Sequence, residues 1–223
     1  MDVFVTGTDT GVGKTVVSSV LVKILTETGK KTAYYKPIQT GAVIDNNEKS
    51  SEDVLEVTRL TGLHYNSGKY SSYLLDAPMS PFQAAKKENI KISIDTIMED
   101  FQHIKKNNEH VVIEGAGGLY VPITDEALMI DMIEIMNVPV VVVVRPELGT
   151  INHSLLTIKA LQKRNITILG FIVNFYPSKD KETEIIRDNP RMINKYSGIK
   201  CLGKVRESVL PVLDYEINKD FIL

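Results

Sequence analysis

A glycine-rich loop that carries a lysine and a threonine follows an apolar segment near the N-terminus. The loop reads Gly7-Thr-Asp-Thr-Gly-Val-Gly-Lys-Thr15 and leads into an amphipathic stretch. Glycines let successive backbone N–H groups turn toward an anion, and the N-terminus of a helix adds its positive dipole end. We therefore expect Lys14 at the β- and γ-phosphates of a nucleotide and the Thr15 hydroxyl on Mg²⁺.

The spacing of this loop differs by one residue from the common phosphate-loop pattern. Five residues separate Gly7 from Gly13, one more than in G-x-x-x-x-G-K-[ST]. The alternative is a glycine-rich turn into a helix with a chance Gly-Lys-Thr. Because an apolar strand pattern precedes the loop and a helical pattern follows it, the sequence favours a Mg²⁺–nucleoside triphosphate site.

A carboxylate follows a second apolar run. The run His110-Val-Val-Ile-Glu114 ends on Glu114 and leads into Gly115-Ala-Gly-Gly118. The metal of a phosphate loop needs an acidic partner, usually at the end of another strand. Alternatively, Glu114 is an exposed side chain before an ordinary turn. Beside the phosphate loop, the metal ligand is the favoured interpretation.

Two further charged residues allow two interpretations each. Lys36 ends a predicted strand, where a cation could neutralise a transferring phosphoryl group or hold an anionic substrate, but solvated surface lysines are common. Asp53 lies just inside a predicted helix, where a carboxylate can cap N–H groups or bind the metal. From the residues alone, the cap is favoured for Asp53.

The hydrophobic pattern predicts the elements that must position these residues. Val140–Val144 is apolar throughout, as in a strand that is covered on both faces of a parallel sheet. The predicted strands are Val3–Thr6, Thr32–Tyr35, His110–Glu114, Val140–Val144, Ile168–Asn174 and Lys200–Gly203. The predicted helices are Lys14–Thr28, Glu52–Thr61, Pro81–Lys87, Ser93–Lys106, Met129–Met136, Asn152–Arg164 and Lys181–Tyr196.

This alternation predicts an α/β fold, in which a mainly parallel central sheet forms the middle of three α/β/α layers with right-handed crossovers. We expect one domain over residues 1–223. The polar stretch Gly41–Ser51 is expected to be a long surface loop near the ligand-binding edge of the sheet. Tyr70–Pro81 has no clear period, and we predict no element there.

The composition excludes several classes of protein. Of 223 residues, 43% are hydrophobic and 24% charged, as in ordinary globular proteins and unlike disordered or collagen-like chains. The net charge of −2 gives no general attraction to nucleic acid or to anionic membranes. Cys201 is the one cysteine, so no intramolecular disulfide can form. The N-terminus has no signal-peptide pattern, and a cytoplasmic protein is expected.

Five motifs in order resemble the dethiobiotin synthetase family. They are Gly7-Thr-Asp-Thr-Gly-Val-Gly-Lys-Thr15, Tyr35-Lys-Pro-Ile-Gln-Thr-Gly41, Ala77-Pro-Met-Ser-Pro81, Glu114-Gly-Ala-Gly-Gly118 and Leu148-Gly-Thr-Ile-Asn-His153. The resemblance runs from Val3 to at least Asn174. It implies a P-loop NTPase-like fold and an ATP-dependent ligase of biotin biosynthesis.

The resemblance also implies a reaction. One amine of 7,8-diaminononanoate takes up CO₂ as a carbamate, whose oxygen attacks the γ-phosphoryl group of ATP and gives a carbamic-phosphoric anhydride and ADP. The second amine closes the ureido ring and expels phosphate. Two anions must meet, so a cluster of positive groups is required. Mg²⁺ is the expected metal, and no biotin prosthetic group is implied.

By resemblance, residues of this chain receive four kinds of role. Catalytic roles fall to Lys36, Lys14 and Thr10, and metal ligation to Thr15, Asp53 and Glu114, which replaces the cap role of Asp53. The nucleotide-binding positions are Gly11, Val12, Gly13, Lys14, Thr15, Val16, Asp53, Glu114, Gly115, Ala116, Gly117, Asn174 (at the adenine ring), Arg206, Glu207 and Ser208. The substrate-binding positions are Thr40, Gly117, Gly118, Leu148, Gly149, Thr150, Ile151 and Asn152, the last five at a homodimer interface.

Two other functions are compatible with a phosphate loop. A dimeric P-loop ATPase switch of the partitioning or division-site type carries an additional lysine early in its phosphate loop, and this loop has none before Lys14. An amidotransferase-type synthetase needs a glutaminase domain, for which the chain is too short. The sequence therefore favours the small-molecule ligase.

Overall fold

The computed structural model describes residues 1–206 and 212–221. Within these residues, seven strands form one sheet in the order β11-β10-β9-β8-β1-β7-β2. The neighbours pair in parallel except β10 and β11, which are antiparallel. The strands are β1 (Asp2–Gly7), β2 (Thr32–Tyr35), β7 (His110–Glu114), β8 (Val140–Val144), β9 (Ile168–Tyr176), β10 (Cys201–Arg206) and β11 (Tyr215–Ile217).

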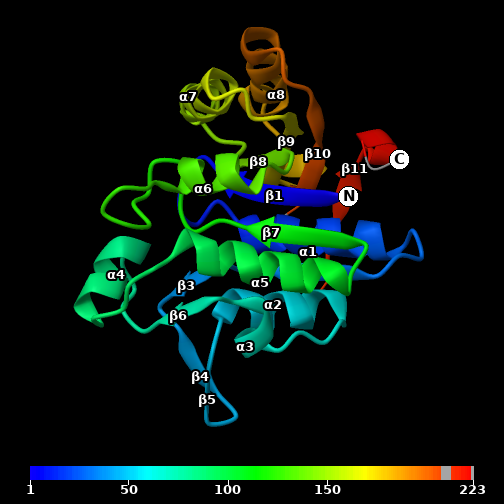
Figure 1. Cartoon of the computed structure of the whole chain (residues 1–223). Coiled ribbons are helices and arrows are strands. Elements are labelled where there is room, and N and C mark those ends of the chain that lie inside the picture. Colours follow the sequence, from blue (N-terminus) through cyan, green and yellow to red (C-terminus); the bar gives the residue numbers. More distant parts are fainter. Residues whose placement is uncertain (207–211, 222–223) are drawn as a thin grey trace.

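Helices cover both faces of this sheet (Figure 1). One apolar core lies between the sheet and two helices, α1 (Lys14–Thr26) and α2 (Glu52–Thr61). The other core lies under α4 (Pro81–Lys87), α5 (Ile94–Lys106), α6 (Met129–Met136), α7 (Thr150–Lys163) and α8 (Glu184–Ser197). The predicted three-layer α/β/α arrangement with a mainly parallel sheet is confirmed.

Alternation along β2 sends neighbouring side chains into different cores. Tyr34 packs in the core of α1 and α2, whereas Tyr35 packs in the core of α5. Both side chains are fully buried. Because side chains alternate along a strand, Lys36, the next residue, returns to the side of Tyr34.

Element boundaries differ from the predicted ones mainly in the second half of the chain. α7 begins at Thr150, before the predicted start at Asn152, because Gly149 takes the left-handed N-cap conformation with φ of 95°. β9 continues to Tyr176, and β10 runs from Cys201 to Arg206. The edge strand β11 and the short α3 (Ser67–Tyr70) were not predicted, since each is too brief to show a period.

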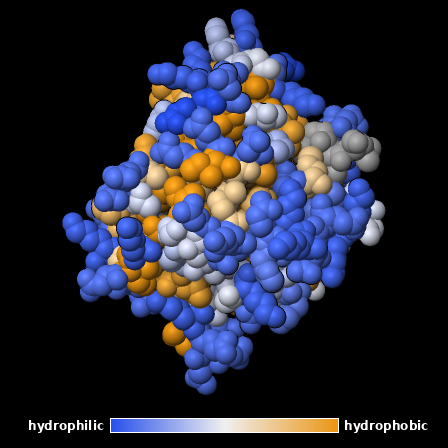
Figure 2. Space-filling view, in the orientation of Figure 1, coloured by the Kyte–Doolittle hydropathy of each residue, from blue (hydrophilic) through white to orange (hydrophobic). Residues whose placement is uncertain are grey.

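The stretch Gly41–Ser51 is a hairpin, so the predicted loop is wrong. β4 (Val43–Asp45) pairs antiparallel with β5 (Glu48–Ser50). Asn46 and Asn47, with φ of 49° and 65°, form the turn, because asparagine tolerates the left-handed conformation that a two-residue hairpin turn requires. The hairpin projects from the bottom of the molecule in Figure 1, and Figure 2 shows an apolar spot there.

A second small sheet lies at the ligand-facing edge. β3 (Ile38–Thr40) pairs in parallel with β6 (Tyr73–Leu75). β6 lies within Tyr70–Pro81, the stretch for which no element was predicted, and β3 was not predicted either. This pairing fixes the backbone that follows Lys36 and carries Thr40 at its end. In the part of the chain that the structure describes, no helix has the length and apolar character needed to cross a membrane.

Candidate active site

The phosphate loop connects β1 to α1 and has the backbone that its sequence predicts. Gly11 and Gly13 have φ of 71° and 82°, and Gly13 is the N-cap of α1. A Cβ at Gly13 would lie 1.9 Å from Nδ2 of Asn174, so only glycine fits there. The loop N–H groups and the N-terminus of α1 form a site suited to phosphate.

Asn174 holds this loop from the neighbouring part of the sheet. Its Nδ2 donates a hydrogen bond to the carbonyl of Val12 at 2.9 Å and contacts the carbonyl of Gly13 at 3.4 Å. The side chain is buried. The structure therefore gives Asn174 a role on the loop backbone, beside the predicted contact with adenine.

Lys14 is buried at the start of α1. Its Nζ donates to the carbonyl of Asp9 at 3.1 Å, so the side chain curls back along the loop. Burial, with a smaller contribution from the Lys36 ammonium, lowers the pKa of Lys14 to about 8. A bound phosphate would raise this pKa again, because an anion within hydrogen-bonding distance favours the ammonium form.

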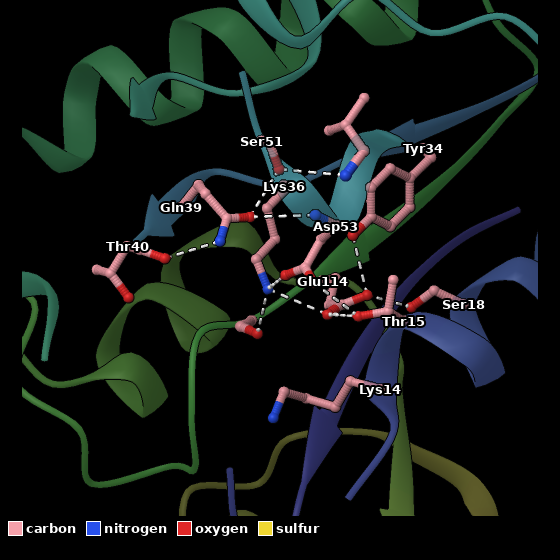
Figure 3. A network of polar contacts seen from close by, with 12 residues as sticks. Lys14, Thr15, Ser18, Tyr34, Lys36, Gln39, Thr40, Ser51, Asp53 and Glu114 are labelled. Atoms are coloured by element: carbon pink, nitrogen blue, oxygen red, sulfur yellow. Dashed lines mark hydrogen bonds and ion pairs between the residues drawn. The ribbon is translucent and has the colours of Figure 1, made fainter. Parts of the chain in front are cut away.

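A buried ion cluster lies at the carboxyl ends of β2 and β7 (Figure 3). Nζ of Lys36 is 2.6 Å from Oδ2 of Asp53 and 3.0 Å from Oε1 of Glu114, and it also donates to the carbonyl of Gly115 at 3.2 Å. Burial alone would lower the pKa of Lys36, but the two carboxylates outweigh it and raise this pKa above the usual range. Burial would raise the pKa of Asp53, and Lys36 instead lowers it.

Asp53 does not cap its helix, so the interpretation that the residues alone favoured is wrong. Ser51 is the N-cap of α2, and its Oγ accepts a hydrogen bond from the N–H of Val54. With the cap already provided, the Asp53 carboxylate is free to turn toward Lys36 and Thr15. A serine two positions upstream was the sequence signal for this arrangement.

Three oxygen-bearing side chains meet beside the ammonium of Lys36. The Thr15 hydroxyl lies 3.0 Å from Oδ1 of Asp53 and 3.0 Å from Oε1 of Glu114. In residues 1–206 and 212–221 no group of three or more His, Cys, Asp and Glu side chains is placed to hold a metal. Two carboxylates and a hydroxyl nevertheless fit Mg²⁺, which keeps several waters and takes further ligands from phosphates. Lys36 already provides a cation at these carboxylates.

Two buried hydroxyl groups also bind the Glu114 carboxylate on the side away from the pocket. Its Oε2 accepts hydrogen bonds from Oγ of Ser18 at 2.8 Å and from the hydroxyl of Tyr34 at 2.9 Å. Burial, together with the Glu114 charge, raises the pKa of Tyr34 well above its ordinary value. Sequence reasoning missed both residues. The available signal for Tyr34 was its place two residues before Lys36 on the same strand face.

The phosphate loop and the ion cluster line a pocket of about 290 Å³. Its lining contains the predicted residues Thr10, Gly11, Gly13, Lys14, Thr15, Lys36, Thr40, Asp53, Glu114, Ala116 and Gly117, together with Ile38 and Gln39. Gln39 was not predicted. Its Oε1 accepts a hydrogen bond from Ser51 Oγ at 2.7 Å, which ties β3 to the start of α2.

Other predicted residues lie elsewhere. Gly118 lines a neighbouring cleft of about 540 Å³, which it shares with Thr10 and α7. Leu148, Gly149 and Thr150 line a third hollow of about 420 Å³, together with Val12. Ile151 and Asn152 lie in the first turn of α7, and Val16 lies in the first turn of α1.

The predicted position at the end of β10, Arg206, does not line the pocket. The Arg206 guanidinium pairs with Asp214 at 3.0 Å and with Glu216. Glu207 and Ser208 lie outside the described residues.

Exposed apolar side chains surround the cleft beside α7. Tyr120 is 64% exposed and Leu156 62%, whereas Leu148, which is 87% exposed, lines the separate hollow at the start of α7. Tyr120 and Leu156 line the same cleft as Thr10 and Gly118. Large apolar side chains that gather on a surface in this way are typical of a protein interface.

Proteins similar in sequence match nearly the full chain. A family model described as an AAA domain matches residues 1–210. The ATP-dependent dethiobiotin synthetase BioD of Thermodesulfovibrio yellowstonii is 35% identical over 227 residues, covering 98% of this chain and 91% of that protein. Proteins of the same name from Methanococcus vannielii and Fusobacterium nucleatum are 37% and 36% identical. The Methanococcus match covers 92% of this chain and 93% of that protein, and the Fusobacterium match covers 99% of this chain and 98% of that protein.

Solved structures with a similar fold are less similar in sequence. A ParA family ATPase from Chlorobium tepidum has a TM-score of 0.56 at 12% identity, over 92% of this chain and 84% of that one. The septum site-determining protein MinD of Pyrococcus horikoshii, complexed with Mg-ADP, has a TM-score of 0.52 at 19% identity, over 93% of this chain and 81% of that one. These likenesses confirm the P-loop NTPase-like fold and carry no further information about function.

We expect Asn174→Ala to weaken the binding of ATP, GTP and CTP by a similar factor, of roughly tenfold each, because it removes one buried hydrogen bond to the loop backbone. Calorimetric titrations with the three nucleotides measure this. Asn107→Ala is the control, because Asn107 is an exposed asparagine at the C-cap of α5 whose amide also bonds a backbone carbonyl. A loss confined to ATP would show that contact with the base outweighs contact with the loop.

Proposed function

We propose, since this chain belongs to the ATP-dependent dethiobiotin synthetase family, that it closes the ureido ring of dethiobiotin from 7,8-diaminononanoate, CO₂ and ATP. The observation that carries the proposal is the cluster of Lys36, Asp53, Glu114 and Thr15, which faces Lys14 in one pocket. A carbamate and a triphosphate are both anions. A pocket with two buried lysines and a helix N-terminus provides the positive groups that such a pair requires.

The proposed metal ligands are Thr15, Asp53 and Glu114. Mg²⁺ bound there would neutralise charge on the phosphates of ATP. The same carboxylates hold Lys36 in the structure. With their charge directed to the metal, the Lys36 ammonium would be available to a carbamate oxygen near Thr10 and Thr40. Lys14 would leave the carbonyl of Asp9 for the γ-phosphate.

The backbone of the second glycine loop completes the proposed site. Ala116 and Gly117 line the pocket, and Gly117 has φ of 68°. A Cβ at Gly117 would lie 2.7 Å from Val121, so a glycine is needed there. We propose that this loop holds the substrate near the phosphate loop, which keeps the carbamate oxygen in line with the γ-phosphorus.

A homodimer is the proposed assembly. The support is the exposed apolar pair Tyr120 and Leu156 in a cleft that also contains Thr10. The exposed Leu148 lines the neighbouring hollow, which shares Thr8 and Asp9 with that cleft. Residues 148–152 precede or begin α7, so the partner's helix N-terminus could receive the substrate carboxylate. We also propose a cytoplasmic location with no nucleic-acid or membrane partner, consistent with the lone Cys201 and the net charge of −2.

The proposed function is tested by a product assay with 7,8-diaminononanoate, bicarbonate and MgATP, in which dethiobiotin and ADP should form in equal amounts. ATP hydrolysis without dethiobiotin would favour the dimeric ATPase switch instead. The similar folds of the ParA and MinD proteins fit that alternative, but at under 20% identity they show fold alone.

Lys36→Ala is expected to lower dethiobiotin formation by about 10²–10³-fold, because a cation beside the transferring phosphoryl group is lost. The variant should also be destabilised in EDTA by about 3–5 kcal/mol, since two carboxylates lose their buried partner. Mg²⁺ should recover part of that stability. Product assays and thermal melts with and without Mg²⁺ measure both effects, with exposed Lys31→Ala as control. Near-normal product formation would remove Lys36 from the mechanism.

Glu114→Gln is expected to weaken Mg²⁺-dependent ATP binding by about tenfold or more, because a charged metal ligand is replaced by a neutral one. Binding of ADP in EDTA should be retained. The measurement is a Mg²⁺ titration at fixed ATP concentration. The matched control is Glu109→Gln, because Glu109 is an exposed glutamate directly before the first residue of β7. Unchanged magnesium curves for Glu114→Gln would count against its role as a ligand.

Leu156→Asp is expected to shift the protein from dimer to monomer, because it places a charge in the exposed apolar pair. Sedimentation velocity at several concentrations measures the shift. Ile185→Asp on α8, where the side chain is 53% exposed, is the control. If the wild-type protein sediments as a monomer, the proposed assembly is wrong.

A further inference from the structure

The two oxygens of the Glu114 carboxylate have different surroundings. Oε1 accepts hydrogen bonds from Thr15 and Lys36, each at 3.0 Å, and both of these residues line the pocket. Oε2 accepts from Ser18 and Tyr34 at 2.8 Å and 2.9 Å, and both donors are fully buried. Oε1 therefore lies on the side of the pocket, and Oε2 lies on the side of the protein interior.

We propose that Tyr34 and Ser18 are positioning residues for the metal ligand Glu114, and that by occupying Oε2 they leave Oε1 as the oxygen offered to the metal. This inference rests on the proposed function, in which Glu114 is a metal ligand. It adds two residues that carry no charge and lie outside the pocket lining. Outer partners of this kind orient a ligand and affect metal affinity.

The strand geometry supports the assignment. Tyr34 and Lys36 are two residues apart, so they lie on the same face of the sheet, and β2 pairs with β7 in the register Tyr34↔Val112 and Tyr35↔Ile113. The next position on β7 is Glu114. One strand end therefore brings a hydroxyl to the inner oxygen and an ammonium to the outer oxygen of the same carboxylate. Figure 3 shows Tyr34 and Ser18 on one side of Glu114 and Lys36 on the other.

The energetics of burial explain why these donors matter. Glu114 is 1% exposed, and a buried carboxylate oxygen without a donor is costly. The final torsion of a glutamate side chain is broad, so hydrogen bonds must fix the plane of the carboxylate. Two hydroxyl donors on Oε2 supply that constraint, one from α1 and one from β2, whether or not a metal is bound on the other side.

β2 also provides a matched control. Tyr35 is the next residue, is equally buried, and also uses its hydroxyl, which lies 2.6 Å from Ser72 Oγ and donates to the carbonyl of Ile97 at 3.1 Å. Its hydroxyl lies in the opposite core and has no hydrogen bond to Glu114. Tyr34→Phe and Tyr35→Phe therefore remove the same atom from neighbouring buried positions, and only the first change touches the carboxylate.

The experiment measures Mn²⁺ binding by electron paramagnetic resonance in the presence of saturating ADP, with the full chain as wild type and variants. We expect Tyr34→Phe to raise the Mn²⁺ Kd about tenfold, and Ser18→Ala to act in the same direction. ADP binding in EDTA should stay within twofold for both. Tyr35→Phe should lower the melting temperature while leaving the Mn²⁺ Kd unchanged.

The outcomes separate this inference from the proposed function. A Tyr34→Phe protein that is destabilised but binds Mn²⁺ like the wild type would overturn the positioning role. An equal rise of the Kd in Tyr35→Phe would overturn it as well, because the effect would then be general loosening. If Tyr34→Phe does not fold, Ser18→Ala gives the same test at the same oxygen. A wild-type protein that binds Mn²⁺ but forms no dethiobiotin would contradict the proposed reaction and leave the metal result standing.

Discussion

A lysine ammonium buried between two carboxylates constrains the whole ligand-facing edge of this molecule. Lys36, Asp53 and Glu114 come from three different segments, and none of the three charges is stable in the interior without the others. Their pairing at 2.6 and 3.0 Å requires that β2 and β7 end side by side and that α2 begins close to both. The hairpin and the small β3–β6 sheet are the connections that allow this meeting.

The phosphate loop depends on a second, independent constraint. Gly13 has a backbone conformation that favours glycine, and the amide of Asn174 fills the space where a side chain would be. The loop is thus fastened to β9, whereas the ion cluster is fastened to β2 and β7. Thr15 belongs to both arrangements, because it begins α1 and its hydroxyl contacts Asp53 and Glu114. Phosphate binding and the proposed metal site are joined at this residue.

The sequence predicted the elements whose patterns are long and the motifs whose chemistry is dense. The all-valine strand 140–144 and the amphipathic α1 lie where they were expected. Predictions failed where a short segment depends on a partner that is far away in sequence. Asn46 and Asn47 make a turn that only the pairing of β4 with β5 reveals, and β3 has no recognisable pattern without β6. Tyr34 and Ser18 look like core residues in any linear reading, because their partner Glu114 is brought to them only by the fold. The cap role that the residues alone favoured for Asp53 is wrong because Ser51 is the N-cap of that helix.

The alternation of side chains along β2 has a consequence for assembly of the protein. Tyr34 and Lys36 face Glu114, and Tyr35 faces the other core. A slip of β2 by one residue against β7 would turn Lys36 into apolar surroundings and bring Tyr35 toward the carboxylate. Such a sheet would hold an unpaired glutamate and a misplaced ammonium, both in its interior. The buried charges of Lys36 and Glu114 therefore also disfavour a shifted strand register during folding.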